Sequence, residues 1–151
     1  MASITTDKLR ELLLKAAAAS PALNLTSDTI KIMLLDSSYV PDKGHAFVSA
    51  ISGHEISGTG YASGFSGSGR KTLGSKAITV DGTNHVVFFD AADVTWTGLN
   101  AGTVGFAAAI KEVTSDADSP VFAVIDLIPD VPTAGNDYTI QWPANGLFNL
   151  G

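Results

Sequence analysis

The chain has 151 residues, a length that fits one domain with a single hydrophobic core. Its net charge of -6 disfavours general binding to phosphate backbones, and the absence of cysteine excludes disulfides, thiolate nucleophiles and thiolate metal sites. Charged residues make up only 16% of the chain against roughly 25% for an average soluble domain, which indicates that some apolar surface is buried against partners.

The N-terminal region predicts a helix over residues 6–19. Its apolar residues recur at the spacing of one helix face: Leu9, Leu12, Leu13, Ala16 and Ala17. Thr6 is suited to cap this helix and Pro21 to follow its end. Because Glu11 and Lys15 interrupt the apolar run, we expect no membrane span, and a signal peptide is the less favoured alternative.

The next segments predict a strand and a loop. Residues 29–35 are β-branched and then wholly apolar, which is typical of a strand buried on both faces. Residues 45–51 could form one or two helical turns. Residues 53–74 are dense in glycine and serine, which predicts a long, exposed and mobile loop.

The C-terminal half predicts a series of short strands. A hairpin is expected over residues 77–90, because Asp81-Gly82 supplies the backbone conformations of a tight turn. Further strand-length runs follow, at residues 94–96, 104–112, 121–127, 138–142 and 147–150. The chain is therefore expected to be mainly β, a β-sandwich or jelly-roll-like domain with one N-terminal α-helix. We expect residues 1–27 to form an assembly arm and residues 28–151 to form the β domain.

The motifs that resemble known chemical sites lack their required context. Residues 64–72 approach the phosphate-binding loop pattern, but Arg70 stands where that pattern needs lysine and no apolar strand precedes the glycines. Asp90 and Asp93 are better explained as turn residues than as an acid and base pair. The histidines, at positions 45, 54 and 85, form no helical metal-binding pair. We therefore predict no catalytic residue, no cofactor and no metal site.

Two sets of apolar residues are candidate contacts with other subunits. The helix stripe Leu9, Leu12, Leu13 and Ala16 is predicted to face a neighbouring subunit rather than the chain's own core, since a β-sandwich closes its core with its own sheets. Three aromatic residues complete the predicted interface: Tyr61, Phe65 and Trp96. For Trp96, as for Trp142, a core position is the default expectation, and the interface position is the functional alternative. Stacking of these aromatics on sugar rings is the basis of a carbohydrate-binding alternative.

Several segments, taken in order, resemble a family of small structural proteins of tailed bacteriophages. They are Asp28-Thr-Ile-Lys-Ile-Met-Leu-Leu35, Glu55-Ile-Ser-Gly-Thr-Gly-Tyr61, Phe89-Asp-Ala-Ala-Asp-Val-Thr-Trp96, Ser119-Pro120 and Tyr138-Thr-Ile-Gln-Trp142. The resemblance extends over residues 28–150 and implies a β-sandwich-like subunit that decorates or cements the phage head. It assigns no catalytic residue.

This resemblance sets the functional expectations. The chain is expected to be a virion structural protein on the capsid exterior, assembled in the bacterial host cytoplasm. Its expected partner is the major capsid protein, with self-association as a homodimer or homotrimer and no contact with nucleic acid or membrane. The alternatives are a tail or neck component and a carbohydrate-binding module on the virion.

Overall fold

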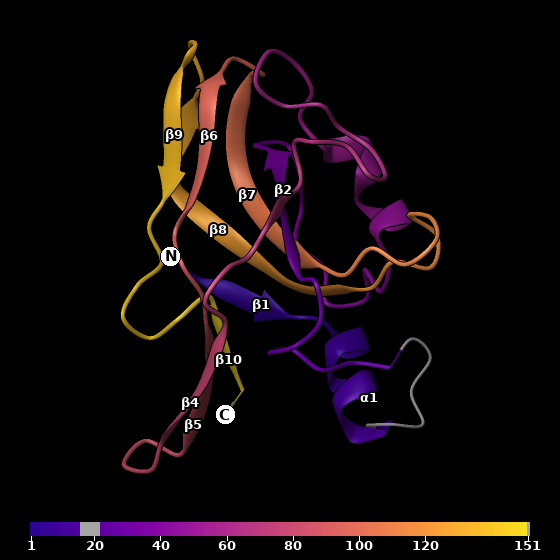
Figure 1. Ribbon diagram of the computed structural model, residues 1–151, viewed down its shortest axis with the longest axis vertical. Coiled ribbons are helices and arrows are strands. Elements are labelled where there is room, and N and C mark those ends of the chain that lie inside the picture. The colour runs from indigo at the N-terminus through magenta and orange to yellow at the C-terminus, as the bar shows by residue number, and fades with distance from the viewer. Residues whose placement is uncertain (16–21, 151) are drawn as a thin grey trace.

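The protein is built mainly from antiparallel β-strands (Figure 1). The structure, a computed structural model, describes residues 1–15 and 22–150. Its strands are β1 (Ser3–Thr5), β2 (Lys31–Asp36), β3 (Lys71–Thr72), β4 (Ala77–Asp81), β5 (Val86–Asp90), β6 (Val94–Leu99), β7 (Thr103–Ile110), β8 (Val121–Pro132), β9 (Asn136–Ile140) and β10 (Phe148–Leu150). The helices of the described residues are α1 (Asp7–Lys15), η2 (Val48–Ala50) and η3 (Ser52–His54). The predicted mainly β fold with an N-terminal α-helix is confirmed.

A five-stranded antiparallel sheet in the order β1-β8-β7-β2-β3 forms the centre of the molecule. Its strand β2 is buried on both faces, as its sequence predicts. Ile32 and Leu34 belong to one hydrophobic cluster, while Met33 and Leu35 belong to a second cluster on the opposite face. The central sheet is therefore covered on both sides by other parts of the chain.

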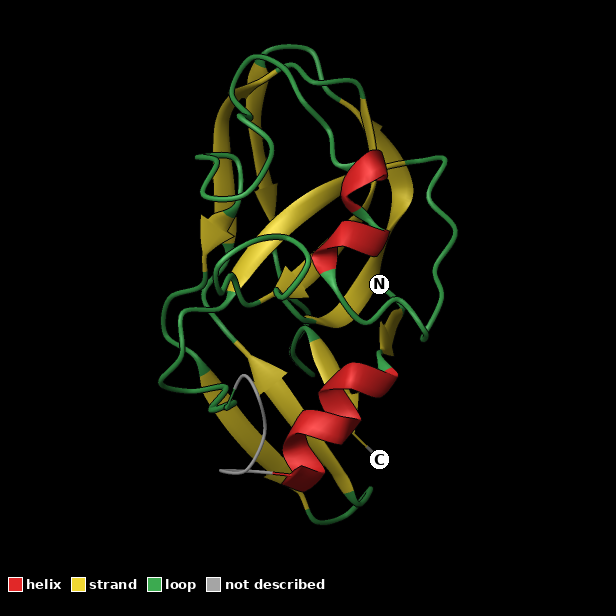
Figure 2. Cartoon of the chain, turned by 90° about the vertical axis from the view of Figure 1, so that its right-hand side faces the viewer, coloured by secondary structure: helices red, strands yellow, loops and turns green. Residues whose placement is uncertain are grey.

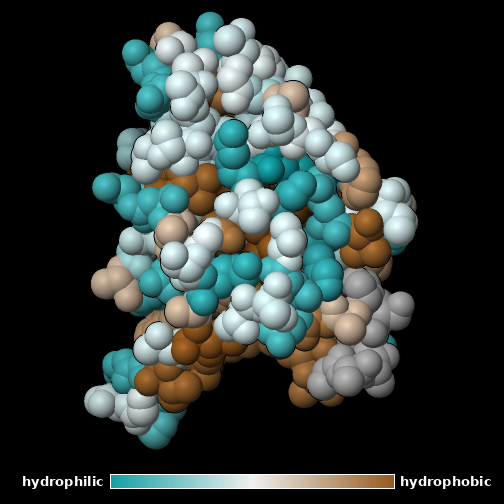
Figure 3. Space-filling model, in the orientation of Figure 1, coloured by the Kyte–Doolittle hydropathy of each residue, from teal (hydrophilic) through white to brown (hydrophobic). Residues whose placement is uncertain are grey.

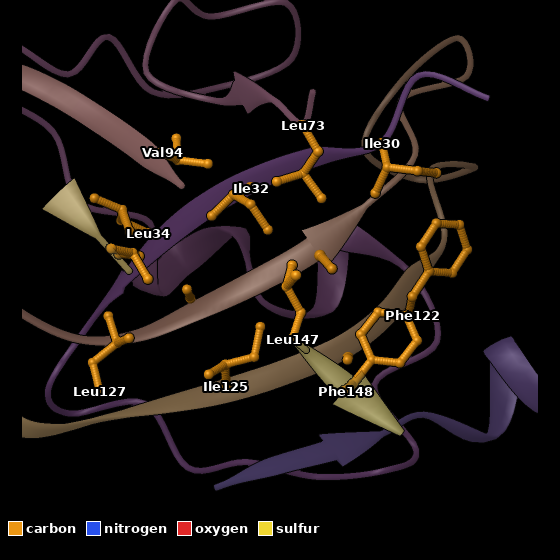
Figure 4. Packing of buried hydrophobic residues seen from close by; sticks show 14 of the residues in the cluster. Ile30, Ile32, Leu34, Leu73, Val94, Phe122, Ile125, Leu127, Leu147 and Phe148 are labelled. Carbon is orange, nitrogen blue, oxygen red and sulfur yellow. The ribbon is translucent and has the colours of Figure 1, made fainter. Parts of the chain in front are cut away.

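The larger hydrophobic cluster joins the central sheet to two smaller sheets (Figure 4). Trp96 and Ile140 enter it from the β6–β9 pair, and Phe89 and Phe148 enter it from a three-stranded sheet in the order β10-β5-β4. On the other face, the smaller cluster is completed by residues of the η2–η3 region, such as Val48. Packing of sheet on sheet makes this a β-sandwich-like domain.

The predicted hairpin is present as β4 and β5, which pair from Ala77↔Asp90 to Asp81↔Val86. The side chain of Asp81 closes the turn by accepting hydrogen bonds from the backbone N–H groups of Thr83 and Asn84, at 2.9 and 3.1 Å. The hairpin extends away from the central sheet at the bottom of Figure 1, and Figure 2 shows α1 beside this smaller sheet.

The N-terminal segment is part of the domain, which corrects the prediction of a separate arm over residues 1–27. Strand β1, which the sequence analysis missed, pairs with β8 in the register Ser3↔Ile125. Thr6 caps α1 as predicted, because its Oγ1 accepts a hydrogen bond from the backbone N–H of Leu9 at 3.1 Å. This pairing brings α1 against β8, and two of its leucines enter the larger hydrophobic cluster. The predicted helix end, residues 16–19, lies outside the described residues.

The glycine-rich segment 53–74 also differs from its prediction. Tyr61, Arg70 and Leu73 are all buried, and β3 joins the edge of the central sheet. Gly69 lies directly against the ring of Tyr61, where a Cβ atom would come within 2.4 Å of its Cδ1. Glycine here permits close packing, so the prediction of a long exposed loop is wrong for this part of the segment.

Substitution of leucines in α1 should separate core from surface. We expect Leu9→Ala, at a fully buried position, to lower the free energy of unfolding by about 2–5 kcal/mol, since it leaves a cavity. Leu14→Ala is the matched control: Leu14 is 89% exposed, so the change should stay within about 0.5 kcal/mol. Urea unfolding measures both. Similar losses in the two variants would show that α1 does not pack as described.

Candidate protein-binding groove

One face of the three-stranded sheet is entirely apolar. The strand registers place Ile78 opposite Phe89 and Val80 opposite Val87, and β10 continues these rows with Phe148 and Leu150. Residues directly opposite one another in a sheet share a face. Six apolar side chains thus form one continuous surface.

The rest of the chain covers only part of this surface. Phe89 and Phe148 are each 2% exposed, because they pack into the larger hydrophobic cluster. Toward the edge strand β4 the exposed fraction of the side chains rises, from 37% for Val87 on β5 to 49% for Ile78 and 70% for Val80 on β4. Residues 1–15 and 22–150 therefore leave the outer part of the apolar face uncovered.

Between this face and α1 lies a groove of about 130 Å³. All of its lining residues are apolar: Leu13, Leu25, Ile78, Val87, Phe88, Phe89, Phe148 and Leu150. In Figure 3 it corresponds to the recess at the lower edge of the molecule, which is bordered by hydrophobic surface. We call this feature the apolar groove. The groove presents apolar side chains and no charged group to a binding partner. The buried centres of protein–protein interfaces are likewise apolar and poor in charged residues.

The groove changes the roles predicted for the helix stripe. Leu9 and Leu12 are 0% and 1% exposed within the chain's own core, so they have no surface to offer a neighbouring subunit. The interface prediction is corrected for both, because the pairing of β1 with β8 carries α1 onto the domain. Leu13 is 37% exposed and lines the groove. Ala16 lies outside the described residues.

The predicted aromatic contacts are also corrected in part. Tyr61 and Trp96 are 1% and 0% exposed, and the Trp96 Nε1–H donates a hydrogen bond to the backbone oxygen of Gly69 at 2.6 Å. Trp96 therefore occupies the core position that was its default expectation, and not the interface. Phe65 remains 39% exposed. A sugar-stacking platform of these three aromatics is not formed.

A buried ion cluster fixes the glycine-rich segment to the central sheet. The Arg70 side chain is fully buried and donates two hydrogen bonds to Glu55, at 2.9 and 2.7 Å, and two to Asp116, at 2.6 and 3.1 Å. A further bond of 3.1 Å reaches Glu112, which also binds Lys31. Every donor and acceptor here meets a partner of opposite charge, which offsets the cost of removing these groups from water.

The cluster shifts the protonation of its members. Burial lowers the pKa of Arg70, but its hydrogen bonds to Glu55 and Asp116 outweigh this effect and raise the pKa above its ordinary value. For the Glu112 carboxyl, burial acts to raise the pKa. The hydrogen bonds from Lys31, Ser66 and Arg70 outweigh this effect, so the pKa of Glu112 lies below its ordinary value. Arg70 and Lys71 are adjacent basic residues in the sequence. Because Arg70 is buried and bound to carboxylates, it is not available to bind a phosphate group.

The remaining polar groups serve local structure. Ser38, His54 and Asp36 meet, but the serine and the carboxylate both approach Nδ1 of the histidine, at 3.3 and 3.4 Å. A catalytic relay would need the serine hydroxyl and the carboxylate to bond different ring nitrogens of the histidine. Asp90 accepts a local hydrogen bond from the backbone N–H of Ala91, whereas Asp93 accepts one from the distant backbone N–H of Trp142, so the predicted local turn role does not describe Asp93.

Comparisons with known proteins found no family model, no curated protein and no solved structure that matches the chain. Within residues 1–15 and 22–150, no helix is long and apolar enough to cross a membrane. The described residues likewise contain no group of three or more His, Asp or Glu side chains placed to hold a metal ion.

The sequence analysis missed most of the groove, although a usable signal was present. Once the hairpin is placed, alternation along β4 and β5 puts Ile78, Val80, Val87 and Phe89 on one face. The sequence does not show that α1 covers only part of this face, because that depends on how β1 pairs.

Removal of the buried cation should destabilise the protein strongly. We expect Arg70→Met to lower the free energy of unfolding by about 3–5 kcal/mol, because it leaves Glu55, Glu112 and Asp116 without their shared partner. The control Lys71→Met removes the neighbouring positive charge, which forms no ion pair within the described residues, and should change stability by about 0.5 kcal/mol or less. Chemical denaturation compares the two. Equal effects would contradict a dominant role for Arg70.

The contribution of Glu112 should disappear in acid. Because folding lowers its pKa from the ordinary value of 4.5, its charged form stabilises the protein at pH values above 4.5. This stabilisation is lost as the pH falls through the lower pKa of the folded state. Glu112→Gln should therefore be less stable than the unchanged chain at pH 7, and the difference should shrink below pH 4.5. A difference that is constant between pH 7 and pH 3 would contradict the assignment.

Proposed function

We propose that this chain is a structural subunit of a tailed-bacteriophage particle that binds other protein subunits through the apolar groove. In its most specific form, the proposal is a head decoration or cement protein, bound to the major capsid protein on the capsid exterior. The observation that carries it is the apolar face of the β10-β5-β4 sheet, which the chain leaves partly uncovered. A groove with no charged lining residue favours a protein partner over a polar ligand.

The energetic argument rests on the partly exposed groove residues. Complete burial of Leu13, Ile78 and Val87 by a partner would contribute on the order of 1 kcal/mol each, because each is already about half buried. Contacts repeated over many copies on a shell would stabilise the assembled particle by mass action.

The placement on a phage head comes from the ordered resemblance over residues 28–150. Within that proposal, assembly takes place in the bacterial host cytoplasm. A tail or neck component is the alternative position for the same binding mode. The carbohydrate-binding alternative has lost its main support, because Tyr61 and Trp96 are buried.

Charge placed in the groove should abolish partner binding while the fold is kept. We expect Leu13→Asp and Val87→Asp, from opposite walls of the groove, each to weaken binding by at least about tenfold, because the carboxylate would be buried without a partner. Val40→Asp is the control, since Val40 is 75% exposed and does not line the groove.

The measurement is co-sedimentation with undecorated shells assembled from the major capsid protein of the same phage, after circular dichroism has verified folding. Parallel incubation with isolated tails identifies the alternative: binding to tails alone would reassign the chain to the tail. Unchanged shell binding by both groove variants would refute the groove as the binding site.

A further inference from the structure

We propose that two copies of this chain pair through the free edge of β4, so that their three-stranded sheets join into one continuous antiparallel sheet. This interface is the strand edge, whereas the groove of the proposed function lies on the sheet face. The inference names a second copy as the occupant and does not depend on which protein the groove binds.

The outer edge of β4 has the features of a pairing surface. β4 is the last strand of the β10-β5-β4 sheet, and Ala77, Ile78, Thr79 and Val80 are all exposed. Natural edge strands are commonly protected by proline, lysine or a β-bulge. Ala77–Asp81 contains no proline or lysine, and its pairing with β5 runs without a register shift. Within residues 1–15 and 22–150, no strand pairs with that side of β4, so its backbone hydrogen-bonding groups there can pair with another strand.

The sequence of β4 is complementary to itself. In an antiparallel pair with a two-fold axis at Thr79, Ile78 of one copy lies opposite Val80 of the other, and the reverse pair follows by symmetry. Moving the axis to Ile78 would place Val80 opposite Lys76, and moving it to Val80 would place Ile78 opposite Gly82. The Thr79 register alone pairs both β-branched residues with each other.

The same arrangement extends the apolar face and distributes charge favourably. Ile78 and Val80 lie on the apolar face, so pairing joins the two exposed faces into a single surface. Lys76 precedes β4 and Asp81 ends it, and the antiparallel order brings the positive end of each strand to the negative end of the other. This opposes the repulsion between two chains that each carry a net charge of -6.

The absence of cysteine allows a direct test of register. In the proposed pair, Thr79 faces its own copy with Cβ atoms about 4.5–5.5 Å apart. Thr79→Cys should therefore form a disulfide-linked dimer under mild oxidation, because this separation is close to the roughly 3.5–4.5 Å of a disulfide. Ala77→Cys is the matched control: it is exposed on the same face of the same strand, but its two copies would lie about 13 Å apart. It should cross-link far more slowly.

Sedimentation equilibrium provides the second measurement. The unchanged chain should show a monomer–dimer equilibrium, and Thr79→Lys should weaken the dimer several-fold, since the symmetry places the two lysines directly opposite one another. Thr79 lies on the opposite face of the sheet from the apolar face and does not line the groove, so Thr79→Lys should keep its shell binding, whereas Leu13→Asp should keep the dimer. The two proposals can thus fail separately. An unchanged chain that stays monomeric at its highest soluble concentration, or equal cross-linking of the two cysteine variants, would overturn the edge pairing.

Discussion

Arg70 can stay buried only if its carboxylate partners stay with it, and this requirement organises the chain segments that contribute those partners. Glu55 lies near the start of the glycine-rich segment, Glu112 follows β7, and Asp116 lies in the turn before β8. The guanidinium therefore ties three distant parts of the chain to one point. A free arginine or a free carboxylate at this depth would be far more costly than the assembled cluster.

The order imposed by Arg70 extends into the core. Glu55 also accepts a hydrogen bond from the hydroxyl of Tyr61, and that hydroxyl accepts one from the backbone N–H of Leu34 on β2, both at 3.0 Å. Gly69, next to Arg70, packs on the Tyr61 ring and receives the indole N–H of Trp96. A polar cluster thereby fixes the position of two of the largest core side chains, and a segment with little apolar area of its own closes one side of the sandwich.

Local patterns were sufficient to predict the elements but not their long-range partners. The apolar run of β2, the hairpin over residues 77–90 and the Thr6 cap are each encoded within a few residues, and all three are present, although His85 and not Gly82 adopts the positive φ in that turn. The glycine-rich segment was misjudged because composition describes flexibility in the unfolded chain, whereas Arg70 and its partners are separated by 15, 42 and 46 residues. The helix stripe was recognised correctly, but its partner was not. Periodicity identifies an apolar face without identifying what covers it.

The pairing of β1 with β8 has a consequence for the order of folding. Ser3 lies opposite Ile125, so β1, which is synthesised before β8, has no partner until the chain has been extended past Ile125. During that interval the leucines of α1 lack the core that later covers them. Closure of so long a loop is entropically costly, so the pairing of β1 comes late in folding. The edge strand is then added to a sheet that has already formed. Until that step, the exposed leucines make the nascent chain a candidate for chaperone binding.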